Sequence, residues 1–500
     1  MFIYLLLFIA FTLISLYLRY VNVRLNKLIP TVPNALSIFE IGLYNIDMRE
    51  IFKKITHIGE WTNSNGGVTK FTFGPIVVYV ISSAPDMSTV LTRCLDKMFI
   101  YDLIRPYVGA EMVAASVPVW KRNRRILDAA FKPHVLDGYI NLFNHQAMRL
   151  TETMANHVNT DMDFTKIITR NLLETVSQTT MGMKIDGEDL ITDSYSKAVD
   201  KVMETITDRF RYPWNILDFV FNNFSTLKKE QDDALKIIWS LSDQMVKQKK
   251  EEILHKHSHK QDYQNKGVKF QSSLEILLEN TMNSENDSML TDLQLRQIVD
   301  NLMLAGFDTT APTILLALVC IGSYPRVQEK VYNEIINELG KEARPIFKDD
   351  LPKLPYLEAV MKETLRLYPS GTVVARTTTT EVQLENFAIP AGCHVMGHIW
   401  ALNRNKEYWG PDADEFRPER WLDDVVPTHP AAFATFSPGR RNCIGKSYVM
   451  TLMKITLAHV IRKFHITADD SKLELEFVIL LKPAAGHSIQ LELRSDEKYR

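Results

Sequence analysis

The stretch Phe436-Ser437-Pro438-Gly439-Arg440-Arg441-Asn442-Cys443-Ile444-Gly445 decides the fold that this sequence predicts. It places Cys443 between two glycines and two arginines, just before a helix-patterned run over residues 446–464. At a helix N-terminus the dipole and the free N–H groups favour a thiolate, which can bind a soft metal. Gly439 and Gly445 have no Cβ and can let a flat ligand approach the main chain. The alternative is a structural cysteine in a tight loop.

Composition narrows the class of protein. The chain has 500 residues, of which 46% are hydrophobic, enough for a large core. The net charge of -2 gives no indication of nucleic-acid binding. The four cysteines are widely scattered and form no C-x-x-C pair, which argues against a zinc site and a disulfide framework and favours a reducing compartment.

The N-terminus predicts a membrane anchor over residues 1–20. Residues 2–18 are apolar apart from Thr12 and Ser15, and as a helix they would span roughly 26 Å, close to a bilayer core. Basic residues follow this run, which places the rest of the chain in the cytosol: Arg19, Arg24 and Lys27. A cleaved signal peptide is the competing interpretation, but the basic n-region and the small-residue cleavage site are missing.

The rest of the chain predicts a mainly α protein with minor β. Pro30 and Pro33 indicate a stiff neck over residues 21–34, followed by a single globular domain over residues 35–500. Apolar periodicity predicts helices over 120–131, 164–181, 189–209, 226–254 and 293–323. Strands are expected over 68–73 and 76–81, as a hairpin, and over 382–384, 394–399 and 488–493. The polar segment 255–272 is expected to be a surface loop.

The run Ala305-Gly306-Phe307-Asp308-Thr309-Thr310 lies in the middle of the longest predicted helix. Glycine and β-branched residues are unfavourable there, which is either a tolerated imperfection or a groove. The Thr309 hydroxyl can bond the carbonyl of Ala305 and bend the helix. Pro312 leaves the Asp308 carbonyl without its helical partner. A hydroxyl and a carboxylate at such a turn could hold dioxygen and pass protons.

Several charged residues gain meaning only from their spacing. Glu363 and Arg366 share one helical face, although exposed pairs of this kind contribute little. Trp120 and Arg124 share another face and could bind one carboxylate through an indole N–H and a guanidinium. Each arginine could equally be an ordinary surface charge. Two further candidates for carboxylate binding are Arg376 and Arg441.

The spacing F-x-x-G-x-R-x-C-x-G in residues 436–445 resembles the haem-binding loop of the cytochrome P-450 monooxygenases. Four further motifs precede this loop in the order that the family has, at residues 120–124, 305–310, 363–366 and 416–421. The resemblance covers residues 30 to 490. The chain is identified as a member of the microsomal type. The resemblance implies the cytochrome P-450 fold, a single globular domain behind an N-terminal transmembrane helix.

The resemblance also implies roles for individual residues. Cys443 would be the proximal thiolate ligand of the haem iron. Thr309 would stabilise iron-bound oxygen, and Asp308 would help deliver protons. A buried charge network behind the haem would consist of Glu363, Arg366 and Arg420. The remaining haem-contacting residues would be Trp120, Arg124, Ala305, Arg376, Phe436, Gly439, Arg441 and Gly445, with Trp120, Arg124, Arg376 and Arg441 binding the propionates.

The sequence looks most like the animal fatty-acid ω-hydroxylase clade and its insect relatives. Many members of that clade carry a glutamate, able to bond covalently to haem, where this chain has Ala305. We therefore expect non-covalent haem b, and ω-regioselectivity does not transfer directly. Arg440 stands where proline is common.

The implied function is NADPH- and O2-dependent hydroxylation or epoxidation of a lipophilic small molecule, such as a fatty acid, hormone-like lipid or xenobiotic. The expected location is the endoplasmic reticulum membrane, with the catalytic domain facing the cytosol. By analogy, the substrate pocket is lined by residues 100–117, 205–221, 299–309, 370–375 and 477–481. Two alternatives remain: a reductase-independent haem-thiolate isomerase or dehydratase, and a non-catalytic haem or ligand carrier.

The expected electron donor is an NADPH-dependent cytochrome reductase, with cytochrome b5 as a further partner. Six basic residues are either ordinary solvated charges or a docking patch for an acidic flavoprotein. They are Lys121, Arg122, Arg125, Lys132, Arg440 and Lys446. We refer to these six residues as the basic patch.

Overall fold

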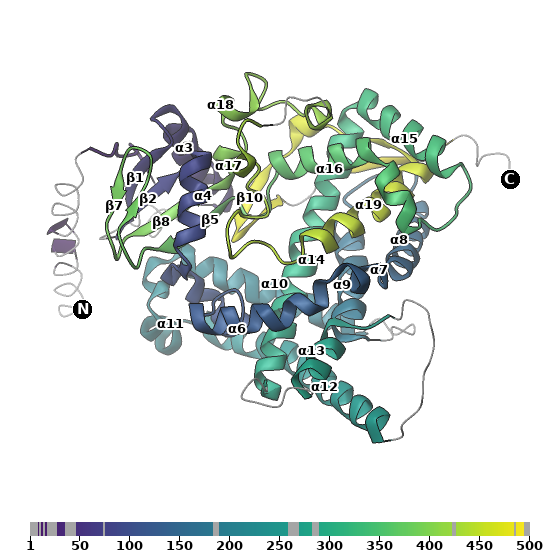
Figure 1. Cartoon of the computed structure of the whole chain (residues 1–500), viewed down its shortest axis with the longest axis horizontal. Helices are drawn as coiled ribbons and strands as arrows, with labels where there is room; N and C mark the ends of the chain where they lie inside the picture. The colour runs from purple at the N-terminus through teal and green to yellow at the C-terminus, as the bar shows by residue number, and fades with distance from the viewer. Residues whose placement is uncertain are drawn as a thin grey trace.

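The structure is a computed structural model of the 500-residue chain. It describes residues 28–35, 47–73, 76–183, 190–258, 270–282, 290–422, 427–484 and 487–494, together with the isolated positions 9, 12, 13, 16 and 17. The predicted anchor over residues 1–20 therefore lies almost entirely outside the described residues. Figure 1 shows the whole chain, with the sheet near the N-terminal part and the helices filling the rest.

Helices dominate the described part of the chain, as the periodicity predicts. In chain order they are α3 (Met48–Ser64), α4 (Ala84–Arg93), α5 (Arg105–Val108), α6 (Val117–Leu127), α7 (Pro133–Asp137), α8 (Ile140–Ala155), α9 (Thr165–Met181), α10 (Leu190–Arg211), α11 (Asp218–Phe224), α12 (Leu227–Ser258), α13 (Ser273–Met282), α14 (Asp292–Ser323), α15 (Pro325–Leu339), α16 (Pro355–Leu367), α17 (Ile399–Leu402), α18 (Lys406–Trp409) and α19 (Lys446–Lys463).

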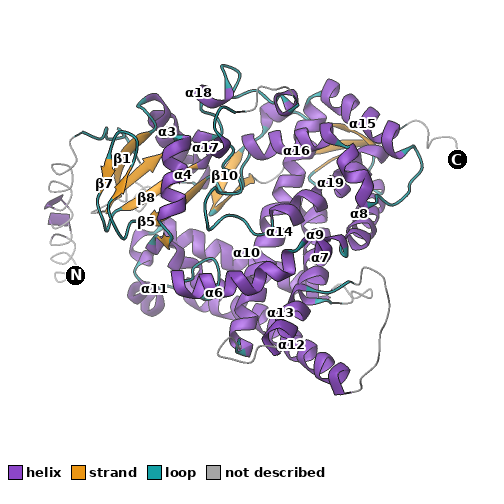
Figure 2. Ribbon diagram, in the orientation of Figure 1, coloured by secondary structure: helices purple, strands orange, loops and turns teal. Residues whose placement is uncertain are grey.

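The strands are short and gather mainly at one side of the helical body (Figure 2). They are β1 (Val68–Phe73), β2 (Ile76–Ile81), β3 (Asp96–Lys97), β4 (Asp161–Met162), β5 (Val373–Thr377), β6 (Val382–Gln383), β7 (Ala388–Ile389), β8 (His394–His398), β9 (Phe464–Thr467), β10 (Leu475–Val478), β11 (Leu480–Pro483) and β12 (Ile489–Leu493). The largest sheet among them has the order β1-β2-β8-β5-β3.

The predicted hairpin is the edge of that sheet. β1 and β2 pair antiparallel, from Val68 opposite Ile81 to Phe73 opposite Ile76. The end of the neck joins the same edge, because the Val32 N–H donates to the Lys70 carbonyl at 2.9 Å. At the opposite edge β3 pairs with β5. Lys97 and Arg376 are partners in that pairing, so two cations from distant parts of the sequence become neighbours.

Helix α14 is the centre of the helical body and contacts α9, α12, α16 and α19. Thr291 starts it with a capping box, and it continues through Pro312 to Ser323. It is the helix in the described residues that is long and apolar enough to cross a membrane, but 78% of its apolar window is buried inside the protein. It is therefore a core helix, as its contacts require.

Most of the predicted elements appear within a few residues of their expected bounds. The prediction places the start of the loop at residue 255, but α12 continues to Ser258. The strand β5 has no counterpart among the predictions. Its sequence, Val373 to Thr377, is short and carries a buried arginine, and only pairing with β3 and β8 makes it a strand.

Candidate functional site

The Cys443 loop is held against α4 at one end and runs directly into α19 at the other. The Cys443 N–H donates to the Phe436 carbonyl at 2.9 Å, which closes the loop. Gly439 has φ of +92°, and a Cβ there would lie 2.4 Å from the Leu91 carbonyl oxygen. The glycine thus permits close contact with α4, and the approach of a flat ligand at this position stays a prediction. Near Gly445, by contrast, the closest atom to an added Cβ is the Cys443 Sγ at 3.9 Å.

The environment of Cys443 combines burial with groups that favour a thiolate. The residue is exposed on one side, yet the surrounding protein raises the pKa of its thiol by desolvation. The backbone N–H groups of Gly445 and Lys446 and the charge of Arg124 act in the opposite direction. The expectation of a depressed pKa is therefore wrong for the protein alone, because burial outweighs the helix start. A coordinated metal ion would itself remove the thiol proton.

Arg124 binds the Cys443 loop. Its guanidinium donates to the Asn442 carbonyl at 2.9 Å and to the Asn442 Oδ1 at 3.1 Å, and its Nε donates to Asp128 at 2.8 Å. In this structure the guanidinium fixes α6 against the loop, and its role as a propionate ligand stays a prediction. This contact gives Arg124 a positioning role and explains its influence on the Cys443 thiol.

Three cations, Lys97, Arg376 and Arg441, gather beside the loop. The Arg441 guanidinium lies 4.7 Å from the centre of the Trp120 ring. Burial and the charges of Arg376 and Arg441 hold the pKa of Lys97 well below its ordinary value. Burial and Arg376 likewise lower the pKa of Arg441 to about 10. Among the described residues, Arg376 Nε and Arg441 Nε and Nη1 are buried without a hydrogen-bond partner. The cluster therefore suits a strongly anionic ligand.

Lys97 was not identified by sequence analysis. Its neighbourhood Asp96-Lys97 carries no motif, and β3 has only these two residues. The available signal was a lysine next to an apolar run, which is too common to be informative. The pairing of β3 with β5 places it beside Arg376.

Glu363 is the centre of a buried charge network. Arg366 donates to both of its oxygens, at 2.9 and 2.8 Å, and Arg420 Nε donates to Oε1 at 2.8 Å. The indole of Trp421 and the backbone N–H of Arg417 complete the shell of the carboxylate. Burial acts to raise the pKa of Glu363, but the two guanidinium groups outweigh it and hold the pKa below its ordinary value. The structure thus brings together the three residues that the motifs singled out.

Asn403 connects this network to the Cys443 loop, and sequence analysis missed it. Its Nδ2 donates to the Arg366 carbonyl at 3.0 Å and to Thr435 Oγ1 at 2.9 Å. Its Oδ1 accepts from the Ala434 N–H at 3.1 Å. The Thr435 hydroxyl in turn donates to the Leu365 carbonyl at 2.8 Å. The charge network therefore fixes the start of the loop through a buried amide.

On α14 the Thr309 hydroxyl donates to the Ala305 carbonyl at 2.7 Å, as expected from the sequence. Ala305 itself is exposed. Gly306 faces the opposite way, because a Cβ there would lie 2.7 Å from Val176 Cγ1 on α9. The Thr309 carbonyl accepts from Ser370 Oγ at 3.1 Å. Ser370 thereby joins the loop before β5 to the middle of α14.

Asp308 has a cationic partner that the sequence did not reveal. Its Oδ1 accepts a short hydrogen bond from Lys482 Nζ on β11, and its Oδ2 is buried without a partner in the described part of the chain. Lys482 is also close enough to Asp200 on α10 to favour the charged form of that carboxyl, although burial raises the Asp200 pKa overall. The β10–β11 hairpin is tied nearby, since the Leu481 N–H donates to the Ser370 carbonyl at 2.8 Å. Lys482 of the hairpin therefore lies near two carboxylates, one on α10 and one on α14.

Comparison with known proteins identifies the family. The family model for Cytochrome P450 matches residues 30–490 of this chain. The chain belongs to the cytochrome P450 family. Cytochrome P450 4V2 from Pongo abelii is 30% identical over 94% of this chain and 90% of that protein. Cytochrome P450 4d2 from Drosophila melanogaster is 29% identical, covering 83% of this chain and 82% of that protein. The 4-series names agree with the clade that the sequence resembles.

The residues of this cytochrome P450 fit haem. Cys443 supplies a sulfur ligand of the type that holds haem iron in these enzymes. The orphaned guanidinium atoms of Arg376 and Arg441, with Lys97, are the donors that two propionates require. Membership of this family makes the protein a haem-thiolate monooxygenase, and the cation cluster has the chemistry that a propionate site would need.

The basic patch of this cytochrome P450 is exposed in the structure. All six side chains, from Lys121 to Lys446, are solvent-exposed. They lie on or beside α6 and the Cys443 loop, which Arg124 holds together. Their shared exposure fits both ordinary solvated charges and a docking surface, so the docking patch stays a prediction.

Proposed function

We propose that this cytochrome P450 is an NADPH- and O2-dependent monooxygenase of a lipophilic small molecule at non-covalently bound haem b. The observation that carries the proposal is the Cys443 thiol with a cluster of three cations beside its loop. The acid–alcohol pair at Asp308 and Thr309 supports it, because it lies on α14, which contacts α19. Bound haem supplies oxygen activation with two electrons from a reductase, one oxygen atom entering the substrate and the other leaving as water.

Individual residues of the chain bind the cofactor and position the Cys443 loop. Cys443 would be the thiolate ligand, and Arg376, Arg441 and Lys97 would hold the propionates. Arg124 and Asn403 fix the loop from its two sides. Ala305 offers no carboxylate for a covalent bond to the cofactor. Phe436 accepts the Cys443 N–H through its carbonyl, which keeps the sulfur at the start of α19.

Proton handling rests on Asp308 and Thr309. The Thr309 hydroxyl is anchored on the Ala305 carbonyl, one turn back along α14. Lys482 holds one oxygen of Asp308 and leaves the other without a bonded partner, so this free oxygen can take or give a proton. Because Lys482 belongs to the hairpin that we expect to line the substrate pocket, the proton donor and the substrate site share one element.

The substrate class follows from the lining segments. The structure brings α5, α9 and β11 into contact with α14, and α10 into contact with β10. Apart from α9, these elements include parts of the segments expected around the substrate, and those segments carry many aliphatic and aromatic side chains. A fatty acid, hormone-like lipid or xenobiotic suits such a lining. An N-terminal anchor in the endoplasmic reticulum membrane would place the enzyme where such molecules partition.

The test is the absorption spectrum of the reduced, carbon-monoxide-bound protein. We expect the thiolate-type Soret shift in the wild type and its loss in Cys443→Ser. With reductase and a substrate found by spin-state titration, we expect NADPH consumption coupled to product, and a lower product yield per NADPH in Asp308→Asn. A thiolate-type Soret band retained by Cys443→Ser would refute the ligand assignment.

The same assay separates the alternatives. An isomerase or dehydratase would convert a peroxide or alcohol without NADPH, and a carrier would bind ligand without consuming NADPH. The acid–alcohol pair favours the monooxygenase, because a reductase-independent enzyme or a carrier has no need to deliver protons to oxygen.

A further inference from the structure

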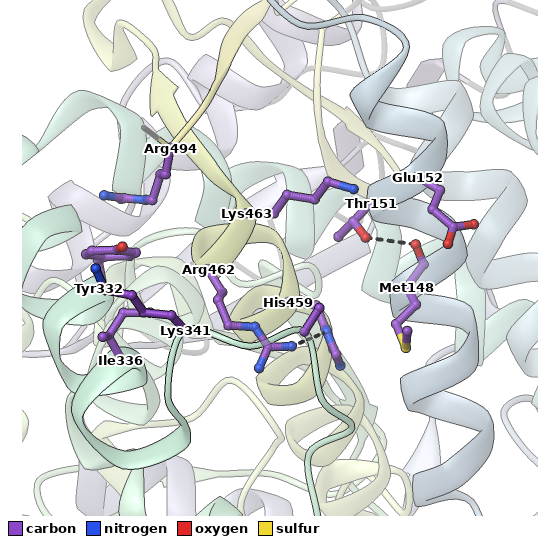
Figure 3. Close-up of a pocket in the computed structure, with 11 residues that line it drawn as sticks. Met148, Thr151, Glu152, Tyr332, Ile336, Lys341, His459, Arg462, Lys463 and Arg494 are labelled. Carbon is purple, nitrogen blue, oxygen red and sulfur yellow. Dashed lines mark hydrogen bonds between the residues drawn. The ribbon is translucent and has the colours of Figure 1, made fainter. Parts of the chain in front are cut away.

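A polar cavity lies at the end of α19 that is far from Cys443. Its volume is about 130 Å³, and it is enclosed by α8, α15, the segment after α15, the C-terminal end of α19 and Arg494 after β12 (Figure 3). Arg462 lies sixteen positions after Lys446, which corresponds to about 24 Å of helix. The cavity is therefore separate from the site around the thiolate.

The lining of this cavity is cationic. Lys341, Arg462, Lys463 and Arg494 carry positive charges, and Glu152 is the carboxylate in the lining. Glu329, outside the lining, also acts on Arg494. His459 adds no charge, because burial and the nearby Arg462 charge lower its pKa to about 3. Arg344, which also lies close to Arg462, is neutralised by its own two hydrogen bonds to Asp350.

Helix capping explains only part of this charge. Cations are favourable near the C-terminus of a helix, and Arg494 Nε does donate to the Ile461 and Phe464 carbonyls, at 3.0 and 3.2 Å. Its guanidinium also lies 3.6 Å from the centre of the Tyr332 ring. These contacts explain why Arg494 lies at the end of α19. Helix capping does not explain Arg462 in the same way.

Arg462 is 8% exposed and only partly satisfied. Its Nη2 donates to the Arg344 carbonyl and to His459 Nδ1, both at 3.0 Å, while Nη1 is buried without a partner in the described residues. Leaving a buried donor unpaired costs roughly 1–3 kcal/mol, and more for a charged group. Arg462 lines the cavity, so an acceptor inside it would remove that cost once the guanidinium turned Nη1 toward it.

We propose that this cavity binds a small oxyanion of the phosphate class. The guanidinium fork of Arg462 and the ammonium group of Lys463 line it from α19, and the Thr151 side chain lines it from α8 (Figure 3). The volume is small and suits a single tetrahedral anion. It is well below the roughly 300–1,000 Å³ of sites for drug-sized ligands. The anion could be free phosphate or the phosphate headgroup of a lipid.

Isothermal titration calorimetry of the holoenzyme with inorganic phosphate, in a buffer of constant ionic strength, tests the proposal. We expect one saturable site per chain. Lys463→Gln removes one lining charge from a partly exposed side chain and should weaken the affinity at least fivefold. Arg462→Lys keeps the charge but loses the fork, and should also weaken binding. The matched control is Lys236→Gln on α12, which removes an exposed lysine outside the cavity and should leave the affinity unchanged.

The two sources of phosphate are separated by sedimentation with phosphatidylcholine vesicles, with and without phosphatidic acid. Phosphatidic-acid-dependent binding that Lys463→Gln reduces would indicate a lipid headgroup, whereas calorimetric binding without this difference would indicate a free anion. Absence of saturable phosphate binding together with vesicle binding insensitive to Lys463→Gln would overturn the proposal. Equal affinities for Lys463→Gln and Lys236→Gln would overturn it as well.

Discussion

At the scale of single residues, Asp300 on α14 shows how the core handles a charge that no motif uses. It is fully buried, its Oδ1 accepts from Ser242 Oγ at 2.5 Å, and its Oδ2 has no partner among the described residues. Burial raises the pKa of Asp300 to about 7, although Ser242 and Arg296 act to lower it. The sequence indicates a helical position here but no perturbed acid, because desolvation depends on what lies around α14.

This pKa makes stability depend on pH in a defined direction. An unfolded aspartate has a pKa of about 3.9, so the folded state binds the proton more tightly and loses stability as pH rises from about 4 to about 7. At about 1.4 kcal/mol per pKa unit the loss is of order 4 kcal/mol. We expect Asp300→Asn, which resembles the protonated form, to gain stability relative to wild type across this range.

Urea denaturation of the holoenzyme at several pH values measures the difference. The control is Asp292→Asn, because Asp292 lies on the same helix but is exposed beside Lys250. A difference between Asp300→Asn and wild type that stayed constant from pH 4 to pH 8 would contradict the assignment.

At the scale of elements, the contact between α14 and α9 depends on one missing side chain. Glycine is costly inside a helix, by roughly 1 kcal/mol relative to alanine. Gly306 is nevertheless required by packing, because a Cβ would lie 2.7 and 2.9 Å from the two methyl groups of Val176. A β-branched valine has little freedom to move aside. The sequence indicated an unusual residue for the middle of a helix. Only the packing of the two helices shows that the glycine makes room for Val176 on α9.

Whether Gly306→Ala stabilises or destabilises the protein should therefore depend on the side chain at residue 176. We expect Gly306→Ala to destabilise the protein by about 1 kcal/mol, since overpacking of about 1–3 kcal/mol exceeds the gain in helix propensity. In a Val176→Ala background the clash is relieved, and the same substitution should stabilise by up to about 1 kcal/mol. Urea midpoints of the four variants give this double-mutant cycle. The same sign in both backgrounds would show that Gly306 serves another purpose.

At the scale of the whole molecule, charge is arranged around the Cys443 loop although the chain as a whole is nearly neutral. The basic patch is exposed on α6 and around the loop, two segments separated by about three hundred residues in the sequence. Arg124 holds them together through Asn442. A surface of this kind speeds the encounter with an acidic partner and loses its effect as salt screens it.

Reversing charges on this surface should slow reduction by the reductase. We expect the double variant Lys121→Glu with Lys446→Glu to have a lower second-order rate constant for the first electron transfer and a weaker dependence on ionic strength. Stopped-flow reduction over a series of salt concentrations measures both quantities. The control reverses Lys236 and Lys472, which are exposed elsewhere. Equal rates and salt slopes for the two double variants would argue against docking at this face.

The sequence by itself determined the features that depend on local spacing. Cys443 at the start of α19, the Glu363–Arg366 pair and the Thr309–Ala305 bond follow from positions a few residues apart, because helical geometry places such residues together. The extent of α14 was likewise predicted from its apolar run.

Only the tertiary structure decided the partners that come from distant segments. Lys97 meets Arg376 through a strand pairing, Lys482 reaches Asp308 across 174 positions, and Arg124 binds the loop 318 positions away. The cavity at Arg462 is built from four separate segments. No periodicity encodes such meetings, because they result from the packing of whole elements and from the burial that this packing imposes on charged groups.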